Sequence, residues 1–332
     1  MKETKLGVVL SGGGAKGAYE AGFLRALAEF DIQPKAIAGT SIGALNGAIY
    51  SAKKDTKESA KLIEKLWNDL ANSTVLEVDK TKAVKNLIEV FMHFAPMPIS
   101  KLSKIAMLVT GAKSSNKGIL TQLPIINRLE LNAPLEELEN GLPFYIGMTK
   151  AQGNWQDFVN FTGFGNEDTT FKKIQELKKE DMHKAIMASA ALPILFDGLE
   201  VEGEIYKDGS LSSTDNEWGN TPVKPLIEDE KCTHIIVCHL NEGSFFNRHD
   251  PLFKDIPIIE IRPKNGTFLS ALDPLQFSVD KIDEWMKQGY DDTKKILAES
   301  FIALKSNSDR IEYEENSQSA VDRLKNRKFS IS

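Results

Sequence analysis

Cysteine is scarce in this sequence of 332 residues, which contains only Cys232 and Cys238. Both lie in or beside a predicted strand over residues 233–238, where six residues of extended chain span roughly 20 Å. A disulfide requires Cα atoms within about 7 Å, so we expect two reduced thiols and a reducing compartment. No C-x-x-C spacing occurs, which argues against metal ligation by these cysteines.

Long apolar runs are also missing. No segment approaches the roughly 18 apolar residues of a membrane span, and residues 1–5 lack the apolar region of a signal peptide. The net charge of −6 argues against a general nucleic-acid binder and against purely electrostatic attachment to anionic lipid. We therefore expect a cytoplasmic protein without a nucleic-acid partner, and we leave peripheral contact with a membrane open.

The most informative feature that is present is a G-x-S-x-G motif at residues 39–43. An apolar run precedes it and a helix of small residues follows it, which is the strand–turn–helix context of a nucleophile elbow. Such a turn exposes the Ser41 hydroxyl at the strand tip, and Gly39 and Gly43 remove Cβ atoms that would clash in it. The following helix N-terminus places partial positive charge beside Ser41. An ordinary glycine-flanked turn is the alternative.

A glycine-rich loop follows the first predicted strand, residues 6–10, and matches G-x-G-x-x-G at Gly12, Gly14 and Gly17. A dinucleotide site would need Asp or Glu about 20 residues further on, and neither is present there. A phosphate-binding Walker loop would need Gly-Lys-Ser/Thr, whereas Lys16 here precedes a glycine. The backbone N–H groups of the loop are therefore candidates for an oxyanion hole beside the elbow. A strand-to-helix turn that binds nothing is the alternative.

The chain begins strand, glycine loop, helix, strand, elbow, helix, and right-handed crossovers make the two strands parallel. Between residues 52 and 141, apolar residues recur at helical spacing and the alternation of strands stops. Helices are predicted there at residues 57–70, 82–95 and 99–109. This region is either a cap whose apolar face meets lipid or an ordinary helical insertion packed on the core, which we favour.

The second half returns to alternating strands and helices. Strands are predicted at residues 144–149, 155–161, 205–207, 234–240 and 256–261, and a long helix at 278–305. The stretch 168–187 begins with polar residues, for which no strand is predicted, and then continues as a predicted helix. The tail from residue 306 is charged, so we expect a loosely docked helix or partial disorder.

Taken in order, these motifs resemble the patatin-like phospholipase family. That family carries G-G-G-x-R/K-G, then G-x-S-x-G, then D-G-G or D-G-A. The corresponding residues here are 12–17, 39–43 and Asp208-Gly209, and residues 188–193 resemble the family's A-S-x-A-x-P segment.

The resemblance covers about residues 5–225. It implies an α/β fold, a three-layer α/β/α sandwich with a mainly parallel central sheet and a helical cap insertion at about 55–140. Residues 226–305 would then be the C-terminal part of the same domain, and residues 306–332 the loosely docked tail.

The resemblance further implies a lipid acyl hydrolase with a Ser-Asp dyad, in which Ser41 is the nucleophile and Asp208 the general base. An acyl ester of a lipid, expected to be a glycerophospholipid, would be the substrate, and no cofactor or metal is required. The implied oxyanion-hole loop comprises Gly12, Gly13, Gly14, Ala15, Lys16 and Gly17. Lys16 replaces the family's usual arginine, and we expect it to support the loop. The base loop contains Gly209 and Ser210, where serine replaces Gly or Ala.

Two alternatives stay open. One is an α/β-hydrolase-type esterase with a Ser-His-Asp triad, for which five histidines are available: His93, His183, His234, His239 and His249. The other is a non-catalytic lipid-binding module that kept the fold. The sequence does not distinguish phospholipase A from lysophospholipase activity or define an oligomeric state.

Overall fold

The structure is a computed structural model that describes residues 4–72, 123–151, 168–191, 198–209, 218–244, 246–269, 273–300 and 318. The predicted strand at 155–161, the predicted helices at 82–95 and 99–109 and the tail from 306, except Gln318, lie outside these residues.

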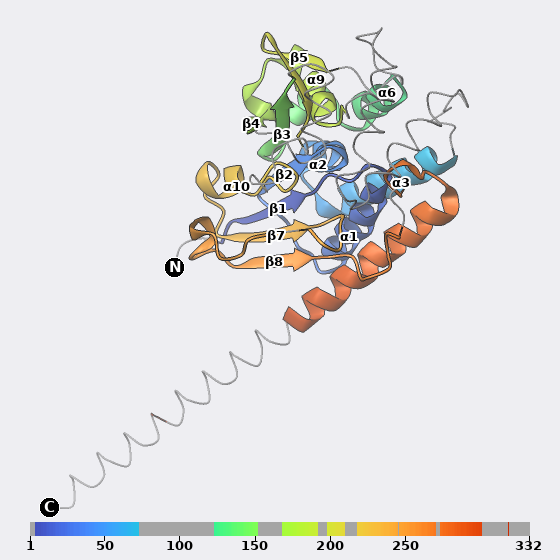
Figure 1. The fold of residues 1–332 in the computed structure, drawn as a ribbon, viewed down its shortest axis with the longest axis vertical. Helices are drawn as coiled ribbons and strands as arrows, with labels where there is room; N and C mark the ends of the chain where they lie inside the picture. Colours follow the sequence, from blue (N-terminus) through green and yellow to red (C-terminus); the bar gives the residue numbers. More distant parts are fainter. Residues whose placement is uncertain are drawn as a thin grey trace, which may run out of the picture. The chain divides into compact units, whose positions relative to one another are not determined.

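A single sheet organises the described residues (Figure 1). Its strands are β1 (Leu6–Leu10), β2 (Ala36–Thr40), β3 (Phe144–Lys150), β4 (Thr169–Lys173), β5 (Leu199–Val201), β6 (Glu204–Asp208), β7 (His234–Cys238) and β8 (Ile258–Ile261). The path through the sheet is β5-β6-β3-β2-β1-β7-β8, and β4 also pairs with β3. Strands β3, β2, β1, β7 and β8 are parallel, whereas β4, β5 and β6 form antiparallel pairs. The predicted mixed α/β fold with a mainly parallel sheet is confirmed.

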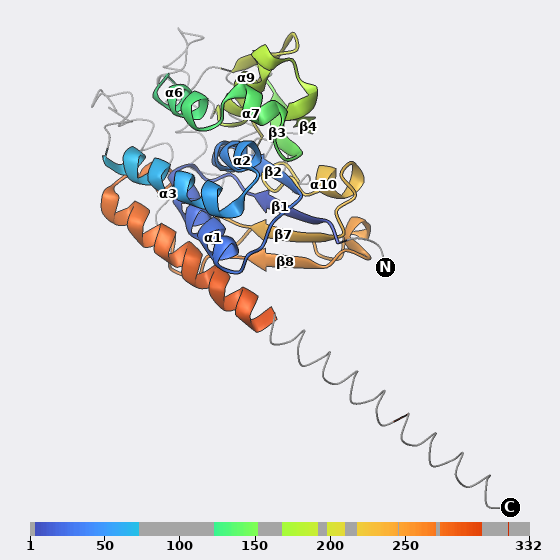
Figure 2. The ribbon, with the colours of Figure 1, turned by 180° about the vertical axis from the view of Figure 1, so that it is seen from behind.

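Helices connect these strands. They are η1 (Gly14–Gly17), α1 (Ala18–Glu29), α2 (Ile42–Lys53), α3 (Thr56–Asn72), α6 (Leu123–Asn132), α7 (Leu135–Glu139), η4 (Ile174–Glu176), α9 (Lys179–Ser189), α10 (Lys224–Glu228), η6 (Pro251–Phe253) and η7 (Asp273–Leu275). Residues 279–300 are also helical, and a second compact unit begins at Thr293 within them. Figure 2 shows α1 and α3 side by side, and they are in contact. None of the described helices is long and apolar enough to cross a membrane.

Helices cover both faces of the sheet because the strands are apolar on both sides. On one face, Val9, Ala38 and Val237 pack with Leu226 of α10 and with aromatic side chains of the β7–β8 connection. On the other face, α2 lies so close that a Cβ on Gly47 would be 2.7 Å from the ring of Phe144. This is the layering that the resemblance implied.

Two strands departed from prediction. The stretch 168–187 was expected to be polar and then helical, but it begins with β4, and β5 was not predicted. Every residue of β4 is only half buried, so its sequence lacks the apolar signal of an inner strand. Its strand conformation depends on antiparallel pairing with β3, a contact that local sequence does not encode.

Glu230, just before β7, connects neighbouring strands at the amino end of the parallel strands. Its carboxylate accepts hydrogen bonds from Lys5 Nζ at 2.8 Å, Lys173 Nζ at 2.6 Å and the Tyr145 hydroxyl at 3.0 Å. Burial on its own raises the pKa of Glu230, but these hydrogen bonds outweigh it and lower the pKa from 4.5 to about 2. The ionised carboxylate therefore stabilises the junction of β1, β3, β4 and β7.

This lowered pKa predicts a specific acid sensitivity. A carboxyl group whose pKa is depressed by folding stabilises the protein above about pH 4.5, and that contribution is lost as the pH falls toward 2. Replacing Glu230→Gln should lower the free energy of unfolding at pH 7 by about 2 kcal/mol, and the difference from wild type should shrink between pH 4.5 and 2. Urea unfolding across this pH range measures it.

The matched control is Glu228→Gln, because Glu228 is exposed and its ion pair with Lys224 is long, at 3.9 Å. We expect that change to have little effect at any pH. A stability difference for Glu230→Gln that stays constant from pH 7 to pH 3 would contradict the account.

Candidate active site

Ser41 occupies a strained turn between β2 and α2. Its backbone angles are φ 56° and ψ −122°, a conformation that a residue with a side chain rarely adopts. The hydroxyl makes no capping hydrogen bond to α2, although Ser41 is the N-cap residue. A Cβ at Gly39 would lie 2.4 Å from the Gly43 carbonyl oxygen, and a Cβ at Gly43 would lie 2.3 Å from that of Leu10. The tight turn expected from the G-x-S-x-G motif is therefore present.

A buried serine, Ser189, is hydrogen-bonded to the backbone of this turn. The backbone N–H of Ser41 donates to Ser189 Oγ at 3.0 Å, and Ser189 Oγ donates to the Gly147 carbonyl oxygen at 2.7 Å. Ser189 is the last residue of α9 and is fully buried. It thus joins the elbow to β3. The sequence placed Ser189 in the A-S-x-A-x-P segment but gave no indication of this role.

Asp208 reaches the same place from another strand. β4 pairs with residues 145–149 of β3 and therefore occupies one edge of that strand. β2 pairs with residues 144–147 of β3 and β6 with residues 148–150, and both stretches overlap the one that is paired with β4. β2 and β6 therefore both lie along the other edge of β3. Along that edge β2 ends with Thr40 opposite Gly147, and β6 ends with Asp208 opposite Met148. Gly147 and Met148 are consecutive, so the carboxyl ends of β2 and β6 meet head to head.

The approach of the two strand ends is close. A Cβ at Gly209 would lie 2.3 Å from the Gly147 carbonyl oxygen and 3.0 Å from Thr40 Cγ2. Asp208 itself is fully buried. The structure therefore brings the predicted nucleophile and the predicted base to one junction, and only glycine fits immediately after the base. Ser210, the other residue of the predicted base loop, lies outside the described residues.

The glycine loop, residues 12–17, lies directly beside Ser41. A Cβ at Gly12 would be 3.1 Å from Ser41 Cβ and 2.5 Å from Asn220 Oδ1. The Gly12 N–H donates to Asn220 Oδ1 at 3.1 Å and to the Asn220 carbonyl oxygen at 3.3 Å. This donor is therefore already occupied, whereas no acceptor for the N–H of Gly13 or Gly14 is found among the described residues. The sequence did not indicate that Asn220 fixes the loop.

Lys16, the lysine in place of the family's usual arginine, is buried. Its Nζ donates to Asn241 Oδ1 after β7 and lies 5.0 Å from the centre of the Phe268 ring. Burial lowers the pKa of Lys16 from 10.5 to about 8, against the opposing effect of nearby Asp273 and Glu242. These contacts connect the glycine loop to the segments that follow β7 and β8.

The described histidines have other partners or positions. His239 Nε2 is 3.0 Å from Glu260 of β8, and His183 Nε2 is 2.7 Å from the carbonyl oxygen of Ala133. His234 begins β7, at the opposite end of the parallel strands from Ser41, and His249 is exposed in the β7–β8 connection. The fifth histidine, His93, lies outside the described residues. The geometry of these four gives no support to a Ser-His-Asp triad. Among the described residues, no three His, Cys, Asp or Glu side chains could share a metal ion.

Comparison with known proteins identifies the family of the chain. The profile of the family described as "Patatin-like phospholipase" matches residues 8–227, which is about two thirds of the chain. The chain belongs to the patatin-like phospholipase family.

Individual relatives match over shorter segments. Lysophospholipase NTE1 of Cryptococcus neoformans is 46% identical over 56 residues, which make up 17% of this chain and 4% of that protein. Patatin-like phospholipase domain-containing protein 7 of Rattus norvegicus is 36% identical over 84 residues, 25% of this chain and 6% of that protein. The chain thus corresponds to a small part of these relatives. The crystal structure of VipD from Legionella pneumophila superimposes with a TM-score of 0.43 and 16% identity over 90% of this chain and 67% of that chain, a likeness too weak to define the fold.

The hydrogen bonds of Ser189 predict that this residue controls the reactivity of Ser41. In Ser189→Ala the Ser41 N–H and the Gly147 carbonyl lose a buried partner, which costs about 1 to 3 kcal/mol. We expect the rate of Ser41 phosphonylation by a serine-directed phosphonate to fall roughly 10- to 100-fold, because the elbow relaxes from its strained conformation.

Ser51→Ala is the matched control. Ser51 is also fully buried and also donates to a carbonyl, that of Leu142 at 2.6 Å, but it lies near the other end of α2. This variant should lose similar stability and keep the wild-type rate of labelling. Equal labelling rates in the two variants would show that Ser189 has no special role at the elbow.

Proposed function

We propose that the protein hydrolyses acyl esters of lipids through a Ser41–Asp208 dyad, with a phospholipase A-type or lysophospholipase activity. One observation carries the proposal: the carboxyl ends of β2 and β6 meet on one edge of β3, beside the glycine loop. Membership of the patatin-like phospholipase family supports lipid esters as the substrate class.

The reaction follows from these positions. The Asp208 carboxylate takes the proton from Ser41 Oγ as the oxygen attacks the ester carbonyl carbon. The N–H groups of Gly13 and Gly14 stabilise the negative charge that develops on the carbonyl oxygen, assisted by the N-terminus of α2. Collapse of the tetrahedral intermediate expels the alcohol, which receives the proton from Asp208, and leaves an acyl-enzyme.

Hydrolysis of the acyl-enzyme uses the same groups. Asp208 removes a proton from water, the resulting hydroxide attacks the acyl carbon, and Ser41 leaves with the proton returned by Asp208. Each step needs only Ser41, Asp208, water and the loop donors. We further propose that the enzyme meets its lipid in the cytoplasm, either dispersed or through peripheral contact with a membrane surface.

The proposal predicts that two substitutions abolish turnover. Ser41→Ala removes the nucleophile and Asp208→Asn removes the base without changing the side-chain volume. Each should lower kcat/KM for nitrophenyl butyrate and for phospholipid vesicles at least about a thousandfold. Circular dichroism and thermal unfolding would establish that both variants are folded.

Single replacement of each of the five histidines by glutamine tests the triad alternative. Every histidine variant that folds should keep turnover within an order of magnitude of wild type. Complete loss in one folded histidine variant would favour a Ser-His-Asp triad. Vesicle binding without any hydrolysis by the wild type would favour a non-catalytic lipid-binding module.

A further inference from the structure

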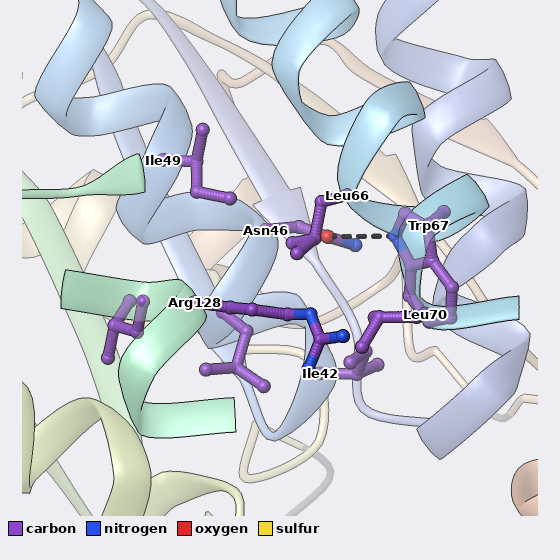
Figure 3. Close-up of a pocket in the computed structure, with 9 residues that line it drawn as sticks. Ile42, Asn46, Ile49, Leu66, Trp67, Leu70 and Arg128 are labelled. Carbon is purple, nitrogen blue, oxygen red and sulfur yellow. Dashed lines mark hydrogen bonds between the residues drawn. The ribbon is translucent and has the colours of Figure 1, made fainter. Parts of the chain in front are cut away.

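One buried side chain of α2 connects this helix to the glycine loop. Asn46 lies five residues after Ser41. Its Nδ2 donates to the Gly17 carbonyl oxygen at 3.2 Å and to Glu20 Oε2 at 2.8 Å. Its Oδ1 accepts from Trp67 Nε1 at 3.1 Å, the bond drawn as a dashed line in Figure 3. An asparagine amide has two N–H donors, so both are in use, and one of them holds the last residue of the glycine loop.

The glycine loop touches the first turn of α2 at both of its ends. A Cβ on Gly43 would be 2.8 Å from the carbonyl oxygen of Ser11, just before the loop. A Cβ on Gly17 would be 2.4 Å from Ile42 Cγ1. Such contacts limit how closely the two segments approach, but each dispersion contact attracts only weakly. Among the described residues, no hydrogen bond other than that of Asn46 joins the loop to α2. This bond therefore supplies the directional attraction between them.

A displacement at the end of the loop also reaches the proposed oxyanion donors, because the loop is one short turn. Residues 14–17 form η1, and the Lys16 N–H donates to the Gly13 carbonyl oxygen at 3.3 Å. A shift of Gly17 therefore moves the N–H groups of Gly13 and Gly14 relative to the nucleophile.

Glu20, the second acceptor of the Asn46 amide, is a fully buried carboxyl group. Burial raises the pKa of Glu20 well above 4.5, against the opposing hydrogen bonds of Asn46 and of the Ser11 backbone. The environment thus favours the neutral carboxylic acid. Because Ser11 directly precedes the glycine loop, Glu20 interacts near the start of the loop while Asn46 is bonded to its end.

We propose that Asn46 is a positioning residue for the reaction: together with Glu20 it holds the glycine loop where the N–H groups of Gly13 and Gly14 meet the developing oxyanion. The inference rests on the proposed function, because an oxyanion forms only if Ser41 attacks an ester. Asn46 itself contacts no reacting atom. A misplaced oxyanion donor weakens binding of the transition state more than binding of the substrate. Loss of Asn46 should therefore lower kcat and leave KM nearly unchanged.

Asn46→Ala removes the hydrogen bond to the loop. We expect kcat for nitrophenyl butyrate to fall roughly 10- to 100-fold, while KM changes less than about threefold. A trifluoromethyl ketone provides a second readout. The serine oxygen bonds to its carbonyl carbon, the base takes the serine proton, and the carbonyl oxygen becomes an oxyanion. Its inhibition constant should rise by about the same factor as kcat falls, since the adduct resembles the transition state.

Tyr50→Phe is the matched control. Tyr50 lies one turn further along α2, is fully buried, and its hydroxyl is hydrogen-bonded to Thr56 rather than to the glycine loop. This variant loses a buried hydrogen bond of the same helix and should keep the wild-type kcat and inhibition constant. Wild-type values of both quantities in folded Asn46→Ala, or equal losses in the two variants, would overturn the positioning role. If Asn46→Ala does not fold, Asn46→Asp serves instead, because it keeps the size and the acceptor for Trp67 and lacks the amide donors.

Two replacements of Glu20 test the second half of the bridge. Glu20→Gln is the neutral isostere of the protonated acid, and it should keep kcat within about threefold of wild type. Glu20→Leu leaves the Asn46 amide without this acceptor and should lower kcat in the same way as Asn46→Ala. Equal losses in the two Glu20 variants would contradict a neutral bridge.

Amide hydrogen exchange separates this proposal from the proposed function, because it requires no turnover. In Asn46→Ala, peptides that cover residues 11–17 should exchange at least about fivefold faster than in wild type, while peptides from β3 and β7 stay unchanged. Tyr50→Phe should leave exchange of residues 11–17 unchanged. Equal exchange in wild type and Asn46→Ala refutes the positioning role even if Ser41 is the nucleophile. Faster exchange confined to residues 11–17 supports it even if turnover proves to need a different nucleophile.

Discussion

The pairing of β3 with two strands on one edge is the constraint on which the site depends. β2 arrives parallel to β3 and ends opposite Gly147, while β6 arrives antiparallel and ends opposite Met148. A slip of β6 by one residue would turn Asp208 to the other face of the sheet, because side chains alternate along a strand. The register of a short backbone ladder therefore determines whether the proposed base can meet the proposed nucleophile.

The elbow and the glycine loop are fixed by residues far away in the sequence. Ser41 adopts a positive φ that costs about 1 to 3 kcal/mol, and a hydrogen bond to Ser189 helps to hold it. Asn220 holds Gly12 by accepting its N–H, and Lys16 joins the loop to Asn241. These contacts form only when the domain is folded, which makes the geometry of the site a property of the whole sheet and its connections.

Local features of the sequence predicted the centre of this arrangement. The parallel β1 and β2, the glycine loop and the elbow are encoded by short apolar runs and by glycines at positions where a Cβ would collide with backbone or side-chain atoms. Sequence also predicted α3, because its apolar residues recur at helical spacing. Each of these signals lies within about twenty residues of chain.

Non-local features escaped prediction for the opposite reason. β4 is half exposed along its length and is defined by its partner, β3. The bond between Ser41 and Ser189 joins residues 148 positions apart, and that between Gly12 and Asn220 joins residues 208 positions apart. An apolar cavity lined by Ile42 of α2, Trp67 of α3 and Leu129 of α6 needs three helices that come from separate segments. No single stretch of sequence contains these contacts.

The central claim, that Ser41 carries the acyl group, is tested most directly by isolating the acyl-enzyme. Wild-type protein is mixed with nitrophenyl butyrate, quenched with acid within the first turnover, digested and analysed by mass spectrometry. The account predicts one butyryl group per chain on the peptide that contains Ser41. Release of nitrophenol with the butyryl group on a different residue, or with no acylated peptide at all, would contradict it.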